Sequence, residues 1–130
     1  MRLRPDPGFR TFAHRLVESG VDIVWGHSAH VVQGVEVYQD RLILYDTGDL
    51  VDDYAVDRRL RNDLSGLFLV HLAPPRIREL TVIPVQIARC QVRLAEGPAE
   101  ELFVERFGRL CGELGTRVER RPEGVIVRLG

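Results

Sequence analysis

Residues 7–26 constrain the fold of this chain more than any other segment. The helical spacing of their apolar side chains predicts a helix from about Pro7 to Ser19, which Asp6 would cap and Gly20 would end. The apolar run Val21–Trp25 follows at once, and its short length and β-branched residues favour a buried strand. A helix followed directly by such a strand is typical of an α/β unit whose strand lies inside a sheet.

The rest of the chain is predicted to add further strands, a long loop and a second helix. Strands are expected at Gly34–Tyr38, Arg41–Asp46, Leu67–Leu72, Ile77–Val85 and Gln91–Leu94, with a terminal hairpin of Arg117–Arg120 and Val125–Leu129. A polar, irregular loop is expected from Thr47 to Ser65 and a helix from about Ala99 to Leu114. The predicted fold class is therefore mixed α/β, in a chain whose 130 residues suit one domain.

Composition and charge argue against several classes of protein. Hydrophobic residues make up 45% of the chain, but no run approaches the ~20 apolar residues of a membrane span. Residues 1–10 contain no apolar run, so we expect no signal peptide among them. The net charge of −1 argues against nucleic-acid binding. All 18 basic residues are arginine, which we attribute to codon bias in a GC-rich genome.

The two cysteines are too few for a disulfide scaffold, and their spacing fits no zinc motif. Cys111 falls on the apolar face of the second predicted helix, so we expect it in the core. Cys90 could have the same role.

Two of the four histidines, His27 and His30, lie in the loop Gly26–Gln33, directly after the predicted buried strand. Open α/β sheets place ligands at the carboxyl ends of their strands. Two imidazoles there could share one metal ion or serve two adjacent ions. On spacing alone, histidines that are solvated or hydrogen-bonded within the loop are the simpler interpretation.

Two longer strings raise the weight of the metal hypothesis. Residues 20–38 read Gly-Val-Asp-Ile-Val-Trp-Gly-His-Ser-Ala-His-Val-Val-Gln-Gly-Val-Glu-Val-Tyr, and residues 42–53 read Leu-Ile-Leu-Tyr-Asp-Thr-Gly-Asp-Leu-Val-Asp-Asp. Both resemble the C-terminal part of the CapA family of poly-γ-glutamate capsule biosynthesis proteins, in the calcineurin-like metallophosphatase superfamily. The resemblance covers roughly residues 7–115. Ser28-Ala29 stands where many relatives have His-Pro, and residues 46–49 resemble the form found in an aspartate-rich branch of the family.

The resemblance implies that residues 1–130 are a single partial domain, the C-terminal half of a metallophosphatase-like αββα sandwich of two sheets. It also implies that His27 and His30 bind a two-metal centre of Mn, Fe or Zn. The family takes its other ligands from upstream elements that this sequence lacks, so we expect the chain alone to be inactive as a hydrolase. On the same reading, Met1 is an internal methionine or the edge of a truncated gene.

Several residues near the histidines have both a functional and a plainer interpretation. Gln33 could orient a histidine or stabilise the turn. Asp46 and Asp49 could orient a ligand or contact substrate, or could belong to a solvated acidic loop paired with nearby arginines. Glu36 is expected on the solvent-exposed face of its strand, and Trp25 in the core rather than at the rim of the site.

The function expected from the resemblance is that of a CapA-like fragment linked to polyglutamate or capsule synthesis, with a remnant of a phosphoesterase-type site. The alternative is a small, non-catalytic α/β interaction module with structural histidines. We expect an exposed sheet edge and apolar surface that the missing N-terminal half or self-association would cover. We expect neither nucleic acid nor a membrane span, and a cytoplasmic location by default, although the family is often envelope-associated.

Overall fold

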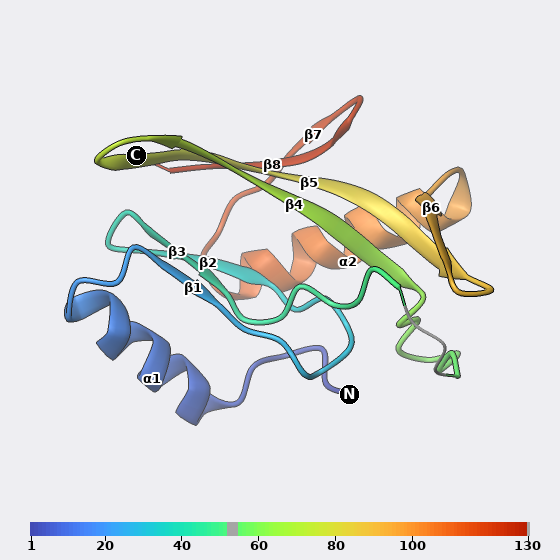
Figure 1. The fold of residues 1–130 in the computed structure, drawn as a ribbon, viewed down its shortest axis with the longest axis horizontal. Coiled ribbons are helices and arrows are strands. Elements are labelled where there is room, and N and C mark those ends of the chain that lie inside the picture. Colours follow the sequence, from blue (N-terminus) through green and yellow to red (C-terminus); the bar gives the residue numbers. More distant parts are fainter. Residues whose placement is uncertain (52–54, 130) are drawn as a thin grey trace.

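The computed structural model describes residues 1–51 and 55–129, which form two helices and eight strands in two sheets (Figure 1). In chain order the elements are α1 (Pro7–Glu18), β1 (Ile23–Trp25), β2 (Val35–Tyr38), β3 (Arg41–Leu44), β4 (Leu64–Ala73), β5 (Arg76–Ala88), β6 (Gln91–Leu94), α2 (Pro98–Glu113), β7 (Glu119–Arg121) and β8 (Gly124–Arg128). The expected mixed α/β fold with two sheets is confirmed.

The two sheets form adjacent layers. The smaller sheet has the order β1-β3-β2, with β1 parallel and β2 antiparallel to β3. The larger sheet has the order β4-β5-β8-β7, and β6 also pairs with β5. Helix α1 covers the outer face of the smaller sheet, and α2 runs along one side of both sheets (Figure 1).

The main core lies between the two sheets and is closed by α2. Phe103 and Phe107 of α2 stack with their ring centroids 5.6 Å apart and pack on valines and leucines of both sheets. Cys111 is fully buried in this core, as predicted, and its Sγ accepts a hydrogen bond from the Val35 amide at 3.3 Å. Burial raises the pKa of the Cys111 thiol to about 12. Cys90, in contrast, is exposed.

Helix α1 begins and packs as its sequence predicts. The Asp6 carboxylate accepts the Gly8 amide at 2.8 Å, which satisfies one of the amides that the first helical turn leaves open. Ala13 and Val17 are buried against Ile43 of β3. The helix therefore protects the outer face of the smaller sheet with one apolar stripe.

The prediction that Val21–Trp25 forms a strand inside a sheet is wrong in one respect. The strand is shorter, Ile23–Trp25, and it forms the edge of the smaller sheet, with Trp25 53% exposed. Ile23 packs on the main core, whereas Val24 packs beneath α1. The apolar run thus reflects a sheet that is covered on both faces, not a strand that has neighbours on both sides.

Glu36 lies under α1, so its predicted solvent-exposed position is also wrong. Its side chain is 7% exposed, because α1 covers the face to which it points. One carboxylate oxygen accepts the Tyr45 hydroxyl at 2.7 Å and lies 2.9 Å from Nε2 of His14. Arg10 lies 3.4 Å from the other oxygen, and the His14 ring stacks on Tyr38. This buried polar cluster joins α1 to the sheet.

The turn between β2 and β3 forms without a glycine. Gln39 and Asp40 both adopt positive φ angles, 50° and 59°, which is the type I′ geometry that suits the twist of a two-residue hairpin. The predicted loop Thr47–Ser65 ends slightly early, because β4 begins at Leu64. Asp52 and Asp53 lie outside the described residues. No helix among the described residues is long and apolar enough to span a bilayer.

Candidate functional site

The histidine loop and the acidic segment meet at one end of the smaller sheet. The loop, residues 26–33, leaves the carboxyl end of β1, and Asp46 and Asp49 follow the carboxyl end of β3. Because β1 and β3 are parallel, these two ends lie at the same edge. The Gly26 amide donates to the Leu44 carbonyl at 2.7 Å, and a Cβ on Gly26 would collide with the Tyr45 carbonyl. Glycine therefore allows the loop to start close against β3.

Asp46 holds the histidine loop through backbone hydrogen bonds. Its side chain is buried, with one carboxylate oxygen accepting the Ala29 amide at 2.6 Å and the other accepting the Gly48 amide at 2.8 Å. Its carbonyl accepts the Gln33 amide at 3.0 Å. One side-chain oxygen of Asp46 and its carbonyl thus fix the histidine loop to the acidic segment, while the other side-chain oxygen shapes the turn at Gly48.

Asp49 orients His30. The Nδ1 atom of His30 lies 2.9 Å from one carboxylate oxygen of Asp49 and 3.2 Å from the other. A carboxylate can only accept here, so Nδ1 carries the proton and Nε2 has the lone pair when the ring is neutral. Histidines that ligate metals are commonly oriented by a carboxylate in this way.

The backbone of the loop is strained at two positions. Ser28 has a φ of 98° and His30 a φ of 59°, a region that residues other than glycine rarely occupy. Such conformations persist only where surrounding contacts enforce them, and they concentrate at functional sites. Here the carboxylates of Asp46 and Asp49 provide those contacts.

His27 faces a cavity of about 470 Å³ beside the loop, whose lining includes Gln33, Asp46 and the first residues of the chain. His30 is not part of this lining. The Gln33 side-chain amide donates to the Arg2 carbonyl at 2.9 Å, so it ties the N-terminal segment to the loop. The contribution of this segment was missed from the sequence, because its contact with the loop depends on the folded position of α1.

Comparison with known proteins identifies the family. Residues 1–54, which include the histidine loop and the acidic segment, match the model of the bacterial capsule synthesis protein PGA_cap. A probable polyglutamine synthesis accessory protein of Mycobacterium tuberculosis is 33% identical over 125 residues, which cover 92% of this chain and 33% of that protein. The capsule biosynthesis protein CapA of Bacillus anthracis is 33% identical over 84 residues, covering 65% of this chain and 20% of that protein. The chain belongs to the CapA family.

The resemblance found in the sequence is therefore confirmed, including its assignment to the C-terminal portion of CapA proteins. The PGA biosynthesis protein CapA of Bacillus subtilis is a further relative, 32% identical over 91 residues, which cover 63% of this chain and 23% of that protein. The chain spans about a third of the length of the Mycobacterium tuberculosis relative.

The described part of this CapA chain does not form a complete metal centre by itself. Residues 1–51 and 55–129 contain no group of three or more His, Cys, Asp or Glu side chains placed to hold one metal ion. The Asp46 oxygens bind backbone amides, and Asp49 binds Nδ1 of His30. A zinc site normally has at least three protein ligands, more than the two imidazoles of His27 and His30 can supply.

Two other expectations for the CapA site can be compared with the structure. Trp25 was expected in the core, but it lies at the exposed rim of the site. There its indole N–H donates to the Thr47 hydroxyl at 3.2 Å. The arginines after the acidic segment do not pair with Asp46 or Asp49 among the described residues. Arg61 instead pairs with Asp63 at 2.8 Å.

Proposed function

We propose that this CapA chain acts in the synthesis of a polyglutamate capsule, with the loop of residues 26–33 as its functional centre. The names of its relatives support the pathway, and the family match falls on the segment that contains the loop. The observation that carries the proposal is the hydrogen bond from Nδ1 of His30 to Asp49, on a strained backbone. A merely solvated histidine would need neither the carboxylate nor the strain.

We further propose that His27 and His30 are two ligands of a divalent Mn, Fe or Zn site, a remnant of a dinuclear phosphoesterase-type centre. Neutral imidazoles suit these metals, and a carboxylate partner such as Asp49 is common for a histidine that ligates a metal ion. The remaining ligands would come from outside the described residues.

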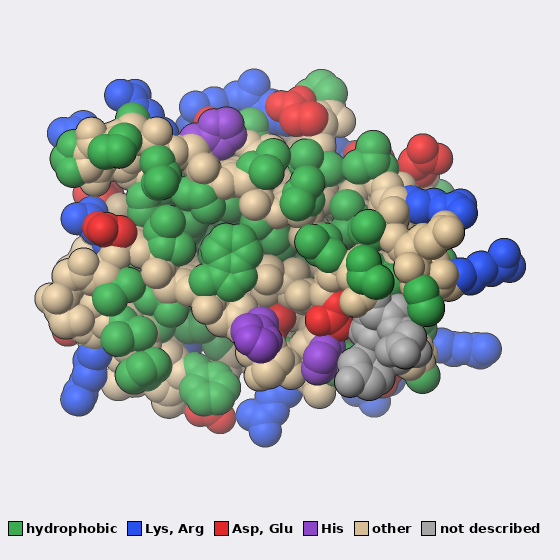
Figure 2. All heavy atoms as spheres, viewed as in Figure 1, with side chains coloured by type: hydrophobic (Ala, Val, Ile, Leu, Met, Phe, Trp, Pro, Cys, Tyr) green, Lys and Arg blue, Asp and Glu red, His purple; other side chains and the backbone are tan. Residues whose placement is uncertain are grey.

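The same proposal assigns a partner to one face of the molecule. Both β1 and β4 are edge strands, and they approach each other where Trp25 meets Phe68 with ring centroids 6.3 Å apart. Large exposed apolar side chains on these strands are Trp25, Leu67, Leu69 and Leu72, and Figure 2 shows hydrophobic atoms across this face. Relatives are about three times as long as this chain. We propose that the additional part of the CapA polypeptide covers this face.

The capsule role is tested by replacing His30→Ala in the gene of the organism that encodes the chain and measuring capsular polyglutamate. The control is Glu105→Ala, because Glu105 is exposed on α2 and lies away from the loop and from the apolar face of β1 and β4. Loss of polyglutamate in His30→Ala alone supports the proposal. Normal capsule in both variants contradicts it.

The metal and partner proposals are tested on the purified chain. Calorimetric titration with Zn²⁺ or Mn²⁺ is expected to show weak binding that His30→Ala removes, with no phosphoesterase turnover. Tight stoichiometric metal, or turnover that both histidines support, would contradict an incomplete site. Light scattering is expected to show association through the apolar face, whereas a clean monomer with a cooperative melt would contradict the partner assignment.

A further inference from the structure

A second cavity lies at the opposite end of the smaller sheet from the histidine loop. Its volume is about 310 Å³. It is lined by Asp40, Arg41, Arg76, Ile77, Arg78 and Leu129. Arg41 begins β3, whereas the histidine loop lies beyond the end of that strand, roughly 10 Å farther along the extended chain. The cavity is therefore separate from the candidate metal site.

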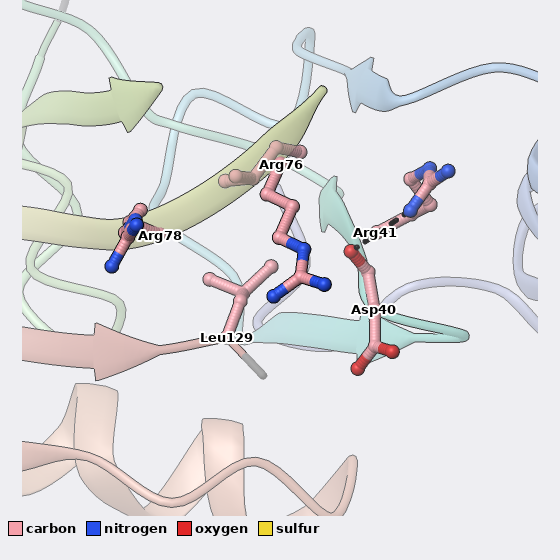
Figure 3. A pocket seen from close by; sticks show the side chains of 6 residues that line it. Asp40, Arg41, Arg76, Arg78 and Leu129 are labelled. Atoms are coloured by element: carbon pink, nitrogen blue, oxygen red, sulfur yellow. Dashed lines mark hydrogen bonds between the residues drawn. The ribbon is translucent and has the colours of Figure 1, made fainter. Parts of the chain in front are cut away.

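Three arginines from two sheets belong to the lining of this cavity (Figure 3). Arg76 and Arg78 lie near the start of β5 on either side of the buried Ile77, and both side chains are exposed. Arg76 reaches past Leu129 toward Asp40 of the β2–β3 turn (Figure 3). Ile77 and Leu129, each 7% exposed, supply a firm apolar part of the lining.

Only part of the charge in the lining is paired within residues 1–51 and 55–129. Arg41 is held by Asp22, with Nε 2.8 Å from the carboxylate. Within the described ranges, neither Arg76 nor Arg78 forms an ion pair. Asp40 is the one acid among the lining residues. A guanidinium group without an ion pair attracts an anion, and an apolar wall beside it strengthens that attraction by lowering the local dielectric constant.

We propose that this cavity binds an anionic ligand through carboxylate or phosphate oxygens, with Arg76 and Arg78 as the principal contacts. Guanidinium groups pair with such oxygens in a planar, two-point geometry. Arg41 belongs to the same lining, but Asp22 already pairs with its guanidinium, so Arg76 and Arg78 are the proposed contacts. The proposal goes beyond the capsule role and does not depend on the metal site.

The experiment is calorimetric titration of the full 130-residue chain at low ionic strength, with inorganic phosphate in one arm and tetraglutamate in the other. Saturable binding of at least one anion is expected. The double variant Arg76→Gln/Arg78→Gln is expected to weaken it about tenfold or more, because it removes charge-assisted hydrogen bonds. The ratio of the two wild-type affinities distinguishes a phosphate ligand from a carboxylate chain.

Two further variants make the result specific. Arg58→Gln/Arg59→Gln makes the same change of charge at exposed positions elsewhere and is expected to leave the affinity within about twofold. Asp40→Asn removes the carboxylate from the lining, keeps a residue that tolerates the turn, and is expected to tighten binding. Absence of saturable binding, equal loss in both double variants, or weaker binding by Asp40→Asn would each overturn the proposal.

Discussion

Replacing Glu36 by alanine tests whether a buried carboxylate fastens α1 to the smaller sheet. The carboxylate accepts the Tyr45 hydroxyl at 2.7 Å, and the His14 ring nitrogen lies 2.9 Å away. Because a carboxylate only accepts, this nitrogen must carry the proton. The pKa of the Tyr45 hydroxyl is far above its usual value, mainly because the group is buried and secondly because it donates a hydrogen bond to Glu36. The hydroxyl therefore remains a donor at neutral pH.

The expected loss follows from these contacts. Hydrogen bonds to a charged group contribute about 1.5–3 kcal/mol each. The Arg10 contact is longer, at 3.4 Å, and its side chain is 41% exposed, so water screens most of its effect. Removing the buried carboxylate also removes its desolvation cost, which offsets part of the loss. We therefore expect Glu36→Ala to lower the free energy of unfolding by about 2–4 kcal/mol.

Urea denaturation followed by circular dichroism at neutral pH measures this free energy by linear extrapolation. Glu105→Ala, at an exposed position of α2, is the control and is expected to change it by less than about 0.5 kcal/mol. Tyr45→Phe should cost about 1–2 kcal/mol and be largely redundant with Glu36→Ala in a double-mutant cycle. A loss below about 0.5 kcal/mol for Glu36→Ala, or fully additive effects, would refute this reasoning.

Three other outcomes are expected. Gly34→Ala should destabilise the chain by about 1–3 kcal/mol in the same urea assay, because a Cβ there would lie 2.5 Å from the Leu110 carbonyl oxygen of α2. An aromatic disulfide reagent should modify exposed Cys90 quickly and buried Cys111 only after unfolding, and two fast thiols in the native chain would contradict the core position. Because the folded chain raises the pKa of Cys111 from 9.0 to about 12, stability from this thiol is complete below pH 9 and is lost as the pH rises toward 12. The wild-type stability should fall faster than that of Cys111→Ala over this window, by up to about 1.4 kcal/mol per pH unit, and parallel curves would count against it.

Features set by local sequence were the most predictable parts of the fold. The Asp6 cap and the start of α1 depend on neighbouring residues, and the structure confirms both. The place of β1 in its sheet depends instead on which strand pairs with β3, about twenty residues away. An apolar run reports that both faces are covered, but it cannot report whether both edges are paired.

In the candidate site, too, the residues could be identified from the sequence, but the contacts between distant segments could not. Spacing and family resemblance pointed to His27 and His30, and to Asp46 and Asp49 nearby. The hydrogen bonds of His30 to Asp49 and of the Ala29 amide to Asp46 arise only when parallel strands bring the two segments together. The arginine cavity was not foreseen, since its walls come from a hairpin turn, the start of β5 and the C-terminal end.

Because Trp25 is exposed, its fluorescence can report binding at the edge of β1. It is the single tryptophan of the sequence, and it stands at the open edge of β1 against Phe68. Indole emission moves to shorter wavelength when water leaves the ring. Binding of any chain at this edge should therefore shift the tryptophan emission to shorter wavelength. The shift can be measured without a label and without altering a residue of the site.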